Sequence, residues 1–179
     1  MHFRKFAASL FTAALCCASS SAFAQVRVTW PDGWENIARP ISAKEADGTT
    51  SKGFQQIAIK KGKNEVPDGM IFIIHMWREG EAPQMDLNTE AQKLKRMQYT
   101  QASKPGNKTE CGEYSKTTIG GVPALSMNCN TLEKGVEFRQ DVSVFLKGKD
   151  FVTLIYTAPK DLYDANKPAF NAVASSLTF

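Results

Sequence analysis

The sequence predicts an α+β fold in which an antiparallel sheet is flanked by helices. Most of the chain after residue 25 consists of short segments that alternate apolar and polar residues between glycine-containing turns, which is typical of antiparallel strands. Two segments, one beginning near residue 86 and one near the C-terminus, instead repeat apolar residues at helical spacing. A helix and a sheet with one apolar face each are stabilised by packing together.

The first 24 residues have the order of a secretory signal peptide. Arg4 and Lys5 precede an uncharged apolar stretch, which ends in the small residues of Ala22-Phe23-Ala24. A membrane anchor is the alternative, but this stretch is short and weakly apolar for one. We therefore expect cleavage after Ala24, a single mature domain of residues 25–179 in the periplasm, and no transmembrane segment after cleavage.

The charge of the mature chain gives no indication of nucleic-acid binding. Removing residues 1–24 removes two basic residues and no acidic residue, so the formal net charge falls from +4 to +2. A nucleic-acid-binding domain usually carries a concentrated excess of Lys and Arg. We expect no nucleic-acid partner.

Residues 26–78 predict four extended segments, one of which begins at Trp34 after a turn. Residues 26–30 alternate and are followed by a type I turn with Trp30 as its first residue and Gly33 as its fourth. Residues 42–53 mix charged and small polar residues and predict an exposed loop. Residues 54–61 alternate again, and residues 70–78 form the most apolar stretch of the mature chain, so these two segments predict an antiparallel pair.

A helix is predicted from Asp86 to a point before Pro105. Leu87, Ala91 and Leu94 lie on one face at helical spacing, and Asp86 can cap the first turn. Proline cannot continue the helix, so the segment should end before it.

The second half of the chain predicts a meander and a closing helix. Phe170 and Leu177 belong to a helical apolar pattern, and Pro168 should lie near the first turn of that helix. The meander strands are expected at residues 110–118, 122–132, 136–146 and 151–157.

The two cysteines of the mature chain predict a disulfide. If residues 119–121 form a three-residue loop, Thr118 lies opposite Val122, and seven further steps place Cys111 opposite Cys129. Directly opposed residues of an antiparallel pair can approach closely enough for a bridge. An oxidising compartment would keep it formed, and its role would be stability.

Several motifs together resemble the PsbP and DcrB-like group. They are the early Trp30-Pro31-Asp32-Gly33-Trp34, the hairpin of residues 117–124, the strand of residues 153–159 and the final residues 175–179. The resemblance implies an antiparallel sheet with helices in three layers and no catalytic residues, because members of that group are typically accessory, chaperone-like or binding proteins. More narrowly, the chain resembles small periplasmic proteobacterial domains to which no function has been assigned.

The inventory of catalytic side chains is small. His75 is the one imidazole left after cleavage, and on an alternating strand it shares a face with Trp77 and apolar residues. Acyl-transfer catalysis needs a nucleophile beside its base, and a zinc site needs three or four converging ligands. A copper site at His75, Met76 and Met70 is disfavoured because strand neighbours point to opposite faces. We expect no catalytic residue, metal or cofactor.

Three tryptophans leave a binding role open. Trp30, Trp34 and Trp77, with His75, are candidates for lining a ligand groove, and the alternative is that they pack in the core. The hypothesis is a non-enzymatic periplasmic accessory or binding protein whose partner is an unknown protein or small ligand of the cell envelope. The alternative is a periplasmic hydrolase or metal-dependent enzyme using His75.

Overall fold

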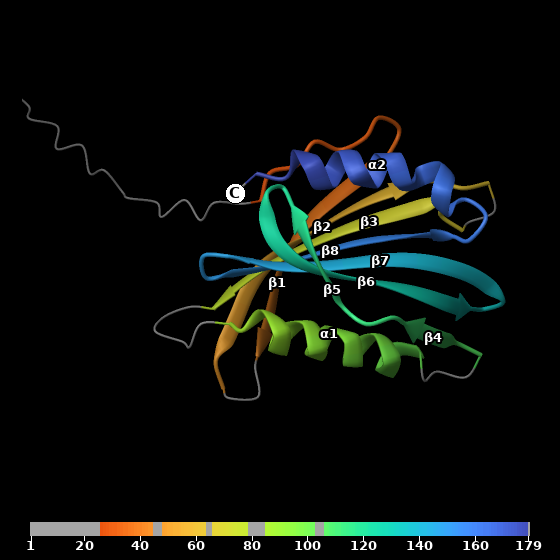
Figure 1. Cartoon of the computed structure of the whole chain (residues 1–179). Helices are drawn as coiled ribbons and strands as arrows, with labels where there is room; N and C mark the ends of the chain where they lie inside the picture. The colour runs from red at the N-terminus through yellow and green to blue at the C-terminus, as the bar shows by residue number, and fades with distance from the viewer. Residues whose placement is uncertain (1–25, 45–47, 64–65, 79–84, 103–105, 179) are drawn as a thin grey trace, which may run out of the picture.

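An eight-stranded antiparallel sheet carries one helix on each face in the computed structural model of the protein (Figure 1). The structure describes residues 26–44, 48–63, 66–78, 85–102 and 106–178. The predicted signal peptide and its cleavage site lie outside the described residues.

The sheet follows the order β1-β2-β3-β8-β7-β6-β4, and β5 also pairs with β6. Every pairing is antiparallel, so the predicted fold class is confirmed. The strands are β1 (Glu35–Lys44), β2 (Thr50–Lys60), β3 (Gly69–Arg78), β4 (Lys108–Cys111), β5 (Ser115–Ile119), β6 (Val122–Glu133), β7 (Val136–Lys147) and β8 (Asp150–Pro159).

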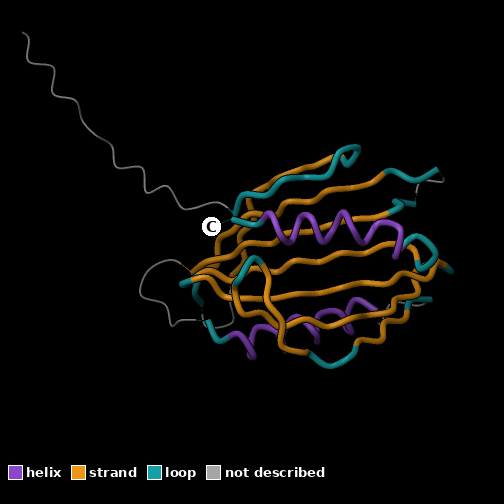
Figure 2. The backbone as a smooth tube through the Cα atoms, turned by 45° about the horizontal axis from the view of Figure 1, so that its top comes forward, coloured by secondary structure: helices purple, strands orange, loops and turns teal. Residues whose placement is uncertain are grey.

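The two helices make the molecule three-layered (Figure 2). Helix α1 (Leu87–Ala102) lies on one face of the sheet, and helix α2 (Tyr163–Ser176) lies on the other. The larger core lies under α2, where Phe170 and Val173 pack on residues of β3 and β8 such as Ile71 and Leu154. Alternate residues of each strand face alternate layers, so one strand contributes to both cores.

Helix α1 begins as the sequence predicts. The Oδ1 atom of Asp86 accepts a hydrogen bond of 2.8 Å from the backbone N–H of Thr89, which caps the first turn. Ala91 is buried and packs in one cluster with Val144 and Phe151 of the sheet. The helical periodicity therefore identified the face that contacts the sheet.

Two expectations for the N-terminal part are wrong. Residues 26–30 form no strand, because their pairing is limited to a single bridge between Arg27 and Thr178. The turn lies one residue later than predicted, since the N–H of Trp34 bonds to the carbonyl of Pro31 and Gly33 takes φ +77° at the third position. A positive φ at that position belongs to a type II turn, where glycine is favoured.

The predicted exposed loop at residues 42–53 is also wrong in part. Residues 42–44 end β1 and residues 50–53 begin β2, so the polar residues belong to a long edge hairpin. Nearly every residue of β1 is exposed, and an edge strand needs little apolar content.

Helix α2 begins earlier than expected, with Pro168 inside it rather than in its first turn. Tertiary hydrogen bonds hold that first part. The Nδ2 atom of Asn166 donates to the carbonyl of Asp68 over 2.8 Å, and Nζ of Lys60 donates to Oδ1 of Asn166 over 2.8 Å. These contacts join residues far apart in the sequence, which is why local pattern did not reveal them.

Candidate ligand-binding site

His75 is buried in β3 and contacts a carboxylate. Its side chain is 3% exposed, and its Nε2 atom lies 2.9 Å from Oδ2 of Asp150, the first residue of β8. Its Nδ1 atom is buried without a hydrogen-bond partner among the described residues. Sequence reasoning missed Asp150, because the pairing of β3 with β8 joins residues 75 positions apart.

Two observations describe the surroundings of the His75–Asp150 pair. No group of three or more His, Cys, Asp or Glu side chains in the described part of the chain is arranged to hold a metal ion. A general base must reach the proton that it removes, and a ring this deeply buried is not open to a substrate. The contact links β3 to the first residue of β8 within the sheet.

The structure separates the three tryptophans. Trp34 is 8% exposed and belongs to the core under α2, where its ring lies against Gly69 at the start of β3. Trp30 packs against the same core. Trp77 lies near the opposite end of β3, so Trp30 and Trp34 do not line a groove with it, and that part of the predicted site is wrong.

Trp77 instead joins a different aromatic group. Its ring centroid lies 5.3 Å from that of His75 and 5.9 Å from that of Phe54 on β2. Phe54 is the registered partner of His75, so the three rings occupy one face of two neighbouring strands. His75 and Trp77 lie side by side, as residues that share one face of a strand do, and Phe54 joins them from β2.

A groove of about 610 Å³ opens beside this aromatic group. Its volume is within the range of roughly 300–1,000 Å³ that is usual for small-molecule sites. Its described lining is mainly apolar and comes from three adjacent strands: Pro40, Ile41 and Ser42 of β1, Lys52, Gly53 and Phe54 of β2, and Trp77 of β3.

A second hollow, of about 410 Å³, is less suited to an apolar ligand. Two ion pairs occupy its lining, with Nζ of Lys108 at 2.7 Å from Glu110 and Nζ of Lys160 at 2.6 Å from Glu137. These charges already have partners, and the groove beside Trp77 is the better candidate.

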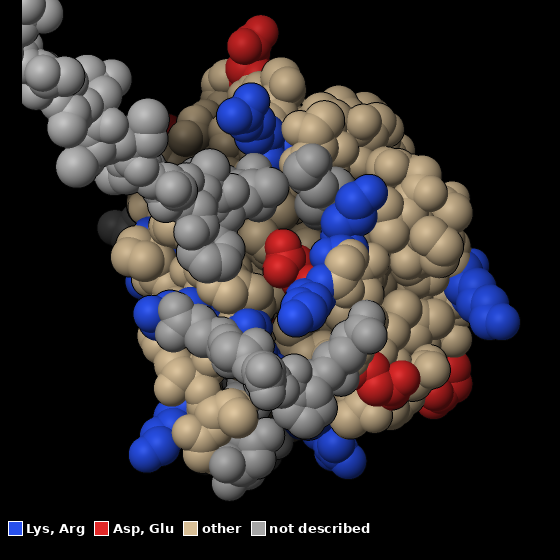
Figure 3. Space-filling model, turned by 90° about the vertical axis from the view of Figure 1, so that its left-hand side faces the viewer, with Lys and Arg blue, Asp and Glu red and all other residues tan. Residues whose placement is uncertain are grey.

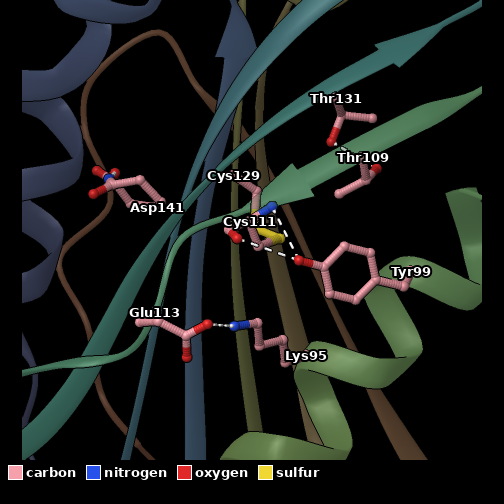
Figure 4. Close-up of a disulfide and its surroundings, with 9 residues drawn as sticks. Lys95, Tyr99, Thr109, Cys111, Glu113, Cys129, Thr131 and Asp141 are labelled. Atoms are coloured by element: carbon pink, nitrogen blue, oxygen red, sulfur yellow. Dashed lines mark hydrogen bonds and ion pairs between the residues drawn. A yellow bond between two sulfur atoms is a disulfide. The ribbon is translucent and has the colours of Figure 1, made fainter.

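The Cys111–Cys129 disulfide is present and joins β4 to β6 (Figure 4). The Tyr99 hydroxyl of α1 donates to the carbonyl of Cys111 over 3.2 Å and accepts from its N–H over 3.4 Å. Cys129 is buried with Met127 and Val142 beneath α1. The bridge therefore holds an edge strand where the helix packs.

The cysteines are opposite each other, although the predicted loop is wrong. Gly120 and Gly121 form a two-residue turn with φ +54° and +77°, so Ile119 pairs with Val122. Two consecutive positive φ values are typical of a type I′ hairpin. Between β4 and β5, the three residues 112–114 lie opposite only two residues of β6, 127–128. This one extra residue restores the pairing of the two cysteines.

A polar cluster lies between α2 and the sheet. The buried carboxylate of Asp141 forms an ion pair with Lys167 and accepts a hydrogen bond from the amide of Asn128. Burial, and then the charge of Arg139, lower the pKa of Lys167 to about 8, and its ammonium lies 4.6 Å from the ring centroid of Phe170. Its members contact one another, which indicates that the cluster attaches α2 to β7.

Residues 25–179 match the model of a family described as a domain of unknown function, DUF4946. The chain belongs to the DUF4946 family. The match begins at Gln25, the first residue after the predicted cleavage site, and extends to residue 179. A search among curated proteins gave no match to this DUF4946 chain.

Solved structures similar to this DUF4946 domain share little sequence with it. LpqN of Mycobacterium tuberculosis, described as involved in cell envelope biogenesis, is 19% identical with a TM-score of 0.52, over 86% of this chain and 82% of LpqN. That likeness shows the fold alone.

Two further structures have lower TM-scores. Cyanobacterial PsbP (CyanoP) from Synechocystis sp. PCC 6803 is 17% identical, with a TM-score of 0.47 over 92% of this chain and 98% of CyanoP. PA94 from Pseudomonas aeruginosa, described as a protein of unknown function and putative regulator, is 11% identical, with a TM-score of 0.46 over 87% and 97%.

Proposed function

We propose that the protein is a non-enzymatic binding domain of the periplasm and that its ligand occupies the groove beside Trp77. The observation that carries this proposal is a mainly apolar groove next to three aromatic rings, in a chain whose buried histidine is paired with Asp150. Aromatic side chains supply large contact areas at binding sites. The binding role that the PsbP and DcrB-like resemblance implies is in agreement.

A neutral apolar fluorescent probe, N-phenyl-naphthylamine, tests the groove. We expect saturable binding to the mature protein, and Phe54→Ala and Trp77→Ala should each weaken it at least tenfold, because both rings line the groove. Leu132→Ala is the matched control, since Leu132 is an exposed apolar residue that lines the other hollow. Binding that is unchanged in both groove variants, or absent from the folded wild type, would contradict the proposal.

An exported location is part of the proposal. Disulfides persist in oxidising compartments, and the first 24 residues have the order of a cleavable signal. No helix in the described part of the chain is apolar and long enough to span a membrane. Mass spectrometry of the periplasmic fraction should find an N-terminus at Gln25, and a chain that retains Met1 there would refute cleavage.

A periplasmic hydrolase or metal-dependent enzyme using His75 is the second candidate. The 2.9 Å contact between His75 and Asp150 favours it, because a carboxylate commonly orients a catalytic imidazole. His75→Gln separates the two candidates. If the protein is a binding domain, this variant, at normal abundance, should restore the wild-type phenotype when it is expressed in a deletion strain. If the protein is an enzyme that uses His75, the variant should show complete loss of function.

A further inference from the structure

In the part of the chain that the structure describes, α1 covers only some of the strands on its side of the sheet. It packs on β4 and β7, and its apolar side chains cluster with Val144 of β7 and Phe151 of β8. Along β3, from Gly69 to Met76, residues alternate between the face under α2, where they are buried, and the α1 side, where they are half-buried. The half-buried apolar residues of β2 and β3 on the α1 side include Ile57, Ile59, Met70, Phe72 and Ile74.

This surface differs from the usual solvent-facing side of an antiparallel sheet, which carries polar side chains. Ile37, Ile57 and Phe72 form one registered row across β1, β2 and β3. Among the described residues, none of the three belongs to the apolar clusters under α1 or α2, and Ile37 is 58% exposed. We call this surface, with Ile37 at its edge, the open face. A contiguous exposed apolar surface marks an interaction site.

One flank of α1 borders the open face. The carboxylate of Glu90 lies 3.6 Å from the guanidinium of Arg78 at the end of β3, and Nζ of Lys93 lies 2.9 Å from the same carboxylate. Met97 is one helical turn beyond Lys93, so it lies on this flank, and it is 56% exposed. The open face is therefore bounded by Met97 on the side of α1 and by Ile37 on the side of β1.

The width of the open face corresponds to one helix. Neighbouring strands lie about 4.8 Å apart, so the axes of β1 and β3 are about 10 Å apart. An α-helix with its side chains is about 10–12 Å wide. The exposed apolar area is on the order of a few hundred Å². A stable protein dimer needs roughly 800 Å² from each partner, so a single helix fits the open face better than a second copy of the chain does.

The open face has an excess of basic side chains beside it. Glu35 contacts Lys61 at 2.7 Å, and Glu90 is shared between two bases, so both acids are already paired. Arg39, in the middle of β1, has no acidic contact among the described residues. Its Nε atom donates to neutral Gln55 over 2.8 Å, which uses one of the five N–H donors of a guanidinium.

Two further observations concern charge. Asp86, one turn before Glu90 on α1, caps the helix, and the positive end of the helix dipole offsets its charge. Figure 3 views the end of the molecule where β3 ends, and Lys and Arg side chains are spread over the described part of that surface. The charge beside the open face therefore complements an acidic occupant.

We propose that the open face binds an amphipathic α-helix of a partner protein, whose apolar stripe is flanked by acidic residues. The stripe packs on Ile57, Phe72 and Ile74 and removes them from water. The acidic flank that lies along β1 accepts hydrogen bonds from the Arg39 guanidinium, and such charge-assisted bonds are the stronger ones. The open face and the groove beside Trp77 are separate sites, because Trp77 shares the opposite side of β3 with Ile71.

Three synthetic peptides of about 18 residues, or five helical turns, test the chemistry of the partner. The first carries a leucine stripe at helical spacing with glutamates on both flanks, and the second carries the same stripe with lysines. The third has the composition of the first in an order without a stripe. Fluorescence anisotropy measures their binding to the mature protein. We expect the first peptide to bind at least tenfold more tightly than the other two, and equal binding of any two would overturn the proposal, as would no binding of the first.

Variants at exposed apolar positions locate the binding surface. Ile37→Glu and Met97→Glu should each weaken binding of the acidic peptide at least tenfold, and their melting temperatures show that they are folded. Leu132→Glu is the matched control, since Leu132 is an exposed apolar residue of β6. Trp77→Ala should leave binding within twofold of wild type, because its ring lies on the other side of the sheet. Binding that survives both glutamate variants, or is lost equally in Leu132→Glu or Trp77→Ala, would place the peptide elsewhere and overturn the proposal.

A charge variant tests the acidic flank. Arg39→Gln should reduce the preference for the acidic over the basic peptide at least threefold. Lys116→Gln, which removes an exposed lysine of β5, should retain the preference. A preference that Arg39→Gln leaves unchanged would overturn the pairing of Arg39 with an acidic flank.

Sedimentation velocity distinguishes a partner helix from a second copy of the chain. We expect the mature protein to sediment as a monomer, both alone and with the acidic peptide bound. A dimer that Ile37→Glu dissociates would show that a second copy covers the open face, and this result would overturn the partner helix.

Discussion

The Nε2 atom of His75 lies 2.9 Å from Oδ2 of Asp150, and this contact joins β3 to the start of its neighbouring strand, β8. Asp150→Ala removes the one hydrogen-bond partner that the described residues give this buried ring. We expect the variant to lose about 1–3 kcal/mol of unfolding free energy in urea, because an unsatisfied buried polar group is costly.

Asp150→Asn should lose less, since an amide oxygen can still accept from the imidazole. Asp161→Ala is the control, because Asp161 is an exposed acid in the turn before α2. Equal unfolding free energies for wild type and Asp150→Ala would show that the contact contributes nothing to stability.

Reduction of the Cys111–Cys129 bridge should lower stability by about 3 kcal/mol, which follows from a separation of 18 residues in the chain-entropy model. Thermal unfolding with and without reductant measures the difference. Thiol counting on unfolded, unreduced mature protein should find no free thiol, and two free thiols would refute the bridge. The double variant Cys111→Ala, Cys129→Ala should show no further change on reduction.

Gly53 occupies a position in β2 where no side chain fits. A Cβ atom there would lie 2.2 Å from the backbone carbonyl oxygen of His75, so a strand would have to move. We expect Gly53→Ala to destabilise the protein by about 1–3 kcal/mol. At Gly112 the nearest atom would lie at 3.8 Å, so Gly112→Ala should be near neutral, and equal melting temperatures of the two variants would contradict the prediction.

Two tyrosines, the half-buried Tyr114 and the buried Tyr156, predict how stability changes at alkaline pH. Burial raises the pKa of Tyr114 to about 12, and burial followed by the charge of Asp164 raises the pKa of Tyr156 to about 12. The folded state keeps these protons when the unfolded state, with a tyrosine pKa near 10, releases them. The contribution of these two tyrosines to the free energy of unfolding is therefore fully present below pH 10 and should fall as the pH rises from about 10 to 12.

Urea denaturation across this pH range measures the loss, and phenolate absorbance of the folded protein should rise later than that of the unfolded protein. Tyr114→Phe should reduce the loss, because its buried hydroxyl has no hydrogen-bond partner among the described residues and titrates with a raised pKa. An alkaline decline of the same size in this variant would argue against the assignment to Tyr114.

The sequence by itself determined the elements whose signals are local. The capping residue Asp86, the spacing of Leu87, Ala91 and Leu94, and the alternation of residues 70–78 report contacts within one helix or one strand, and these predictions are confirmed. The disulfide was predictable because Cys111 and Cys129 lie on the two sides of one hairpin. The turn has one residue fewer than predicted, and the extra residue at 112–114 compensates for it, so the two cysteines are still opposite each other.

Tertiary structure alone decided which distant residues share the candidate site. The antiparallel pairing of β3 with β8 places Asp150 beside His75, and the register of β2 on β3 places Phe54 beside Trp77, while Trp34 enters the core at the other end of β3. Residue patterns report which face a side chain occupies, but not which strand lies next to it. That choice depends on long-range pairing, which is stabilised by burial of the whole sheet rather than by any local segment.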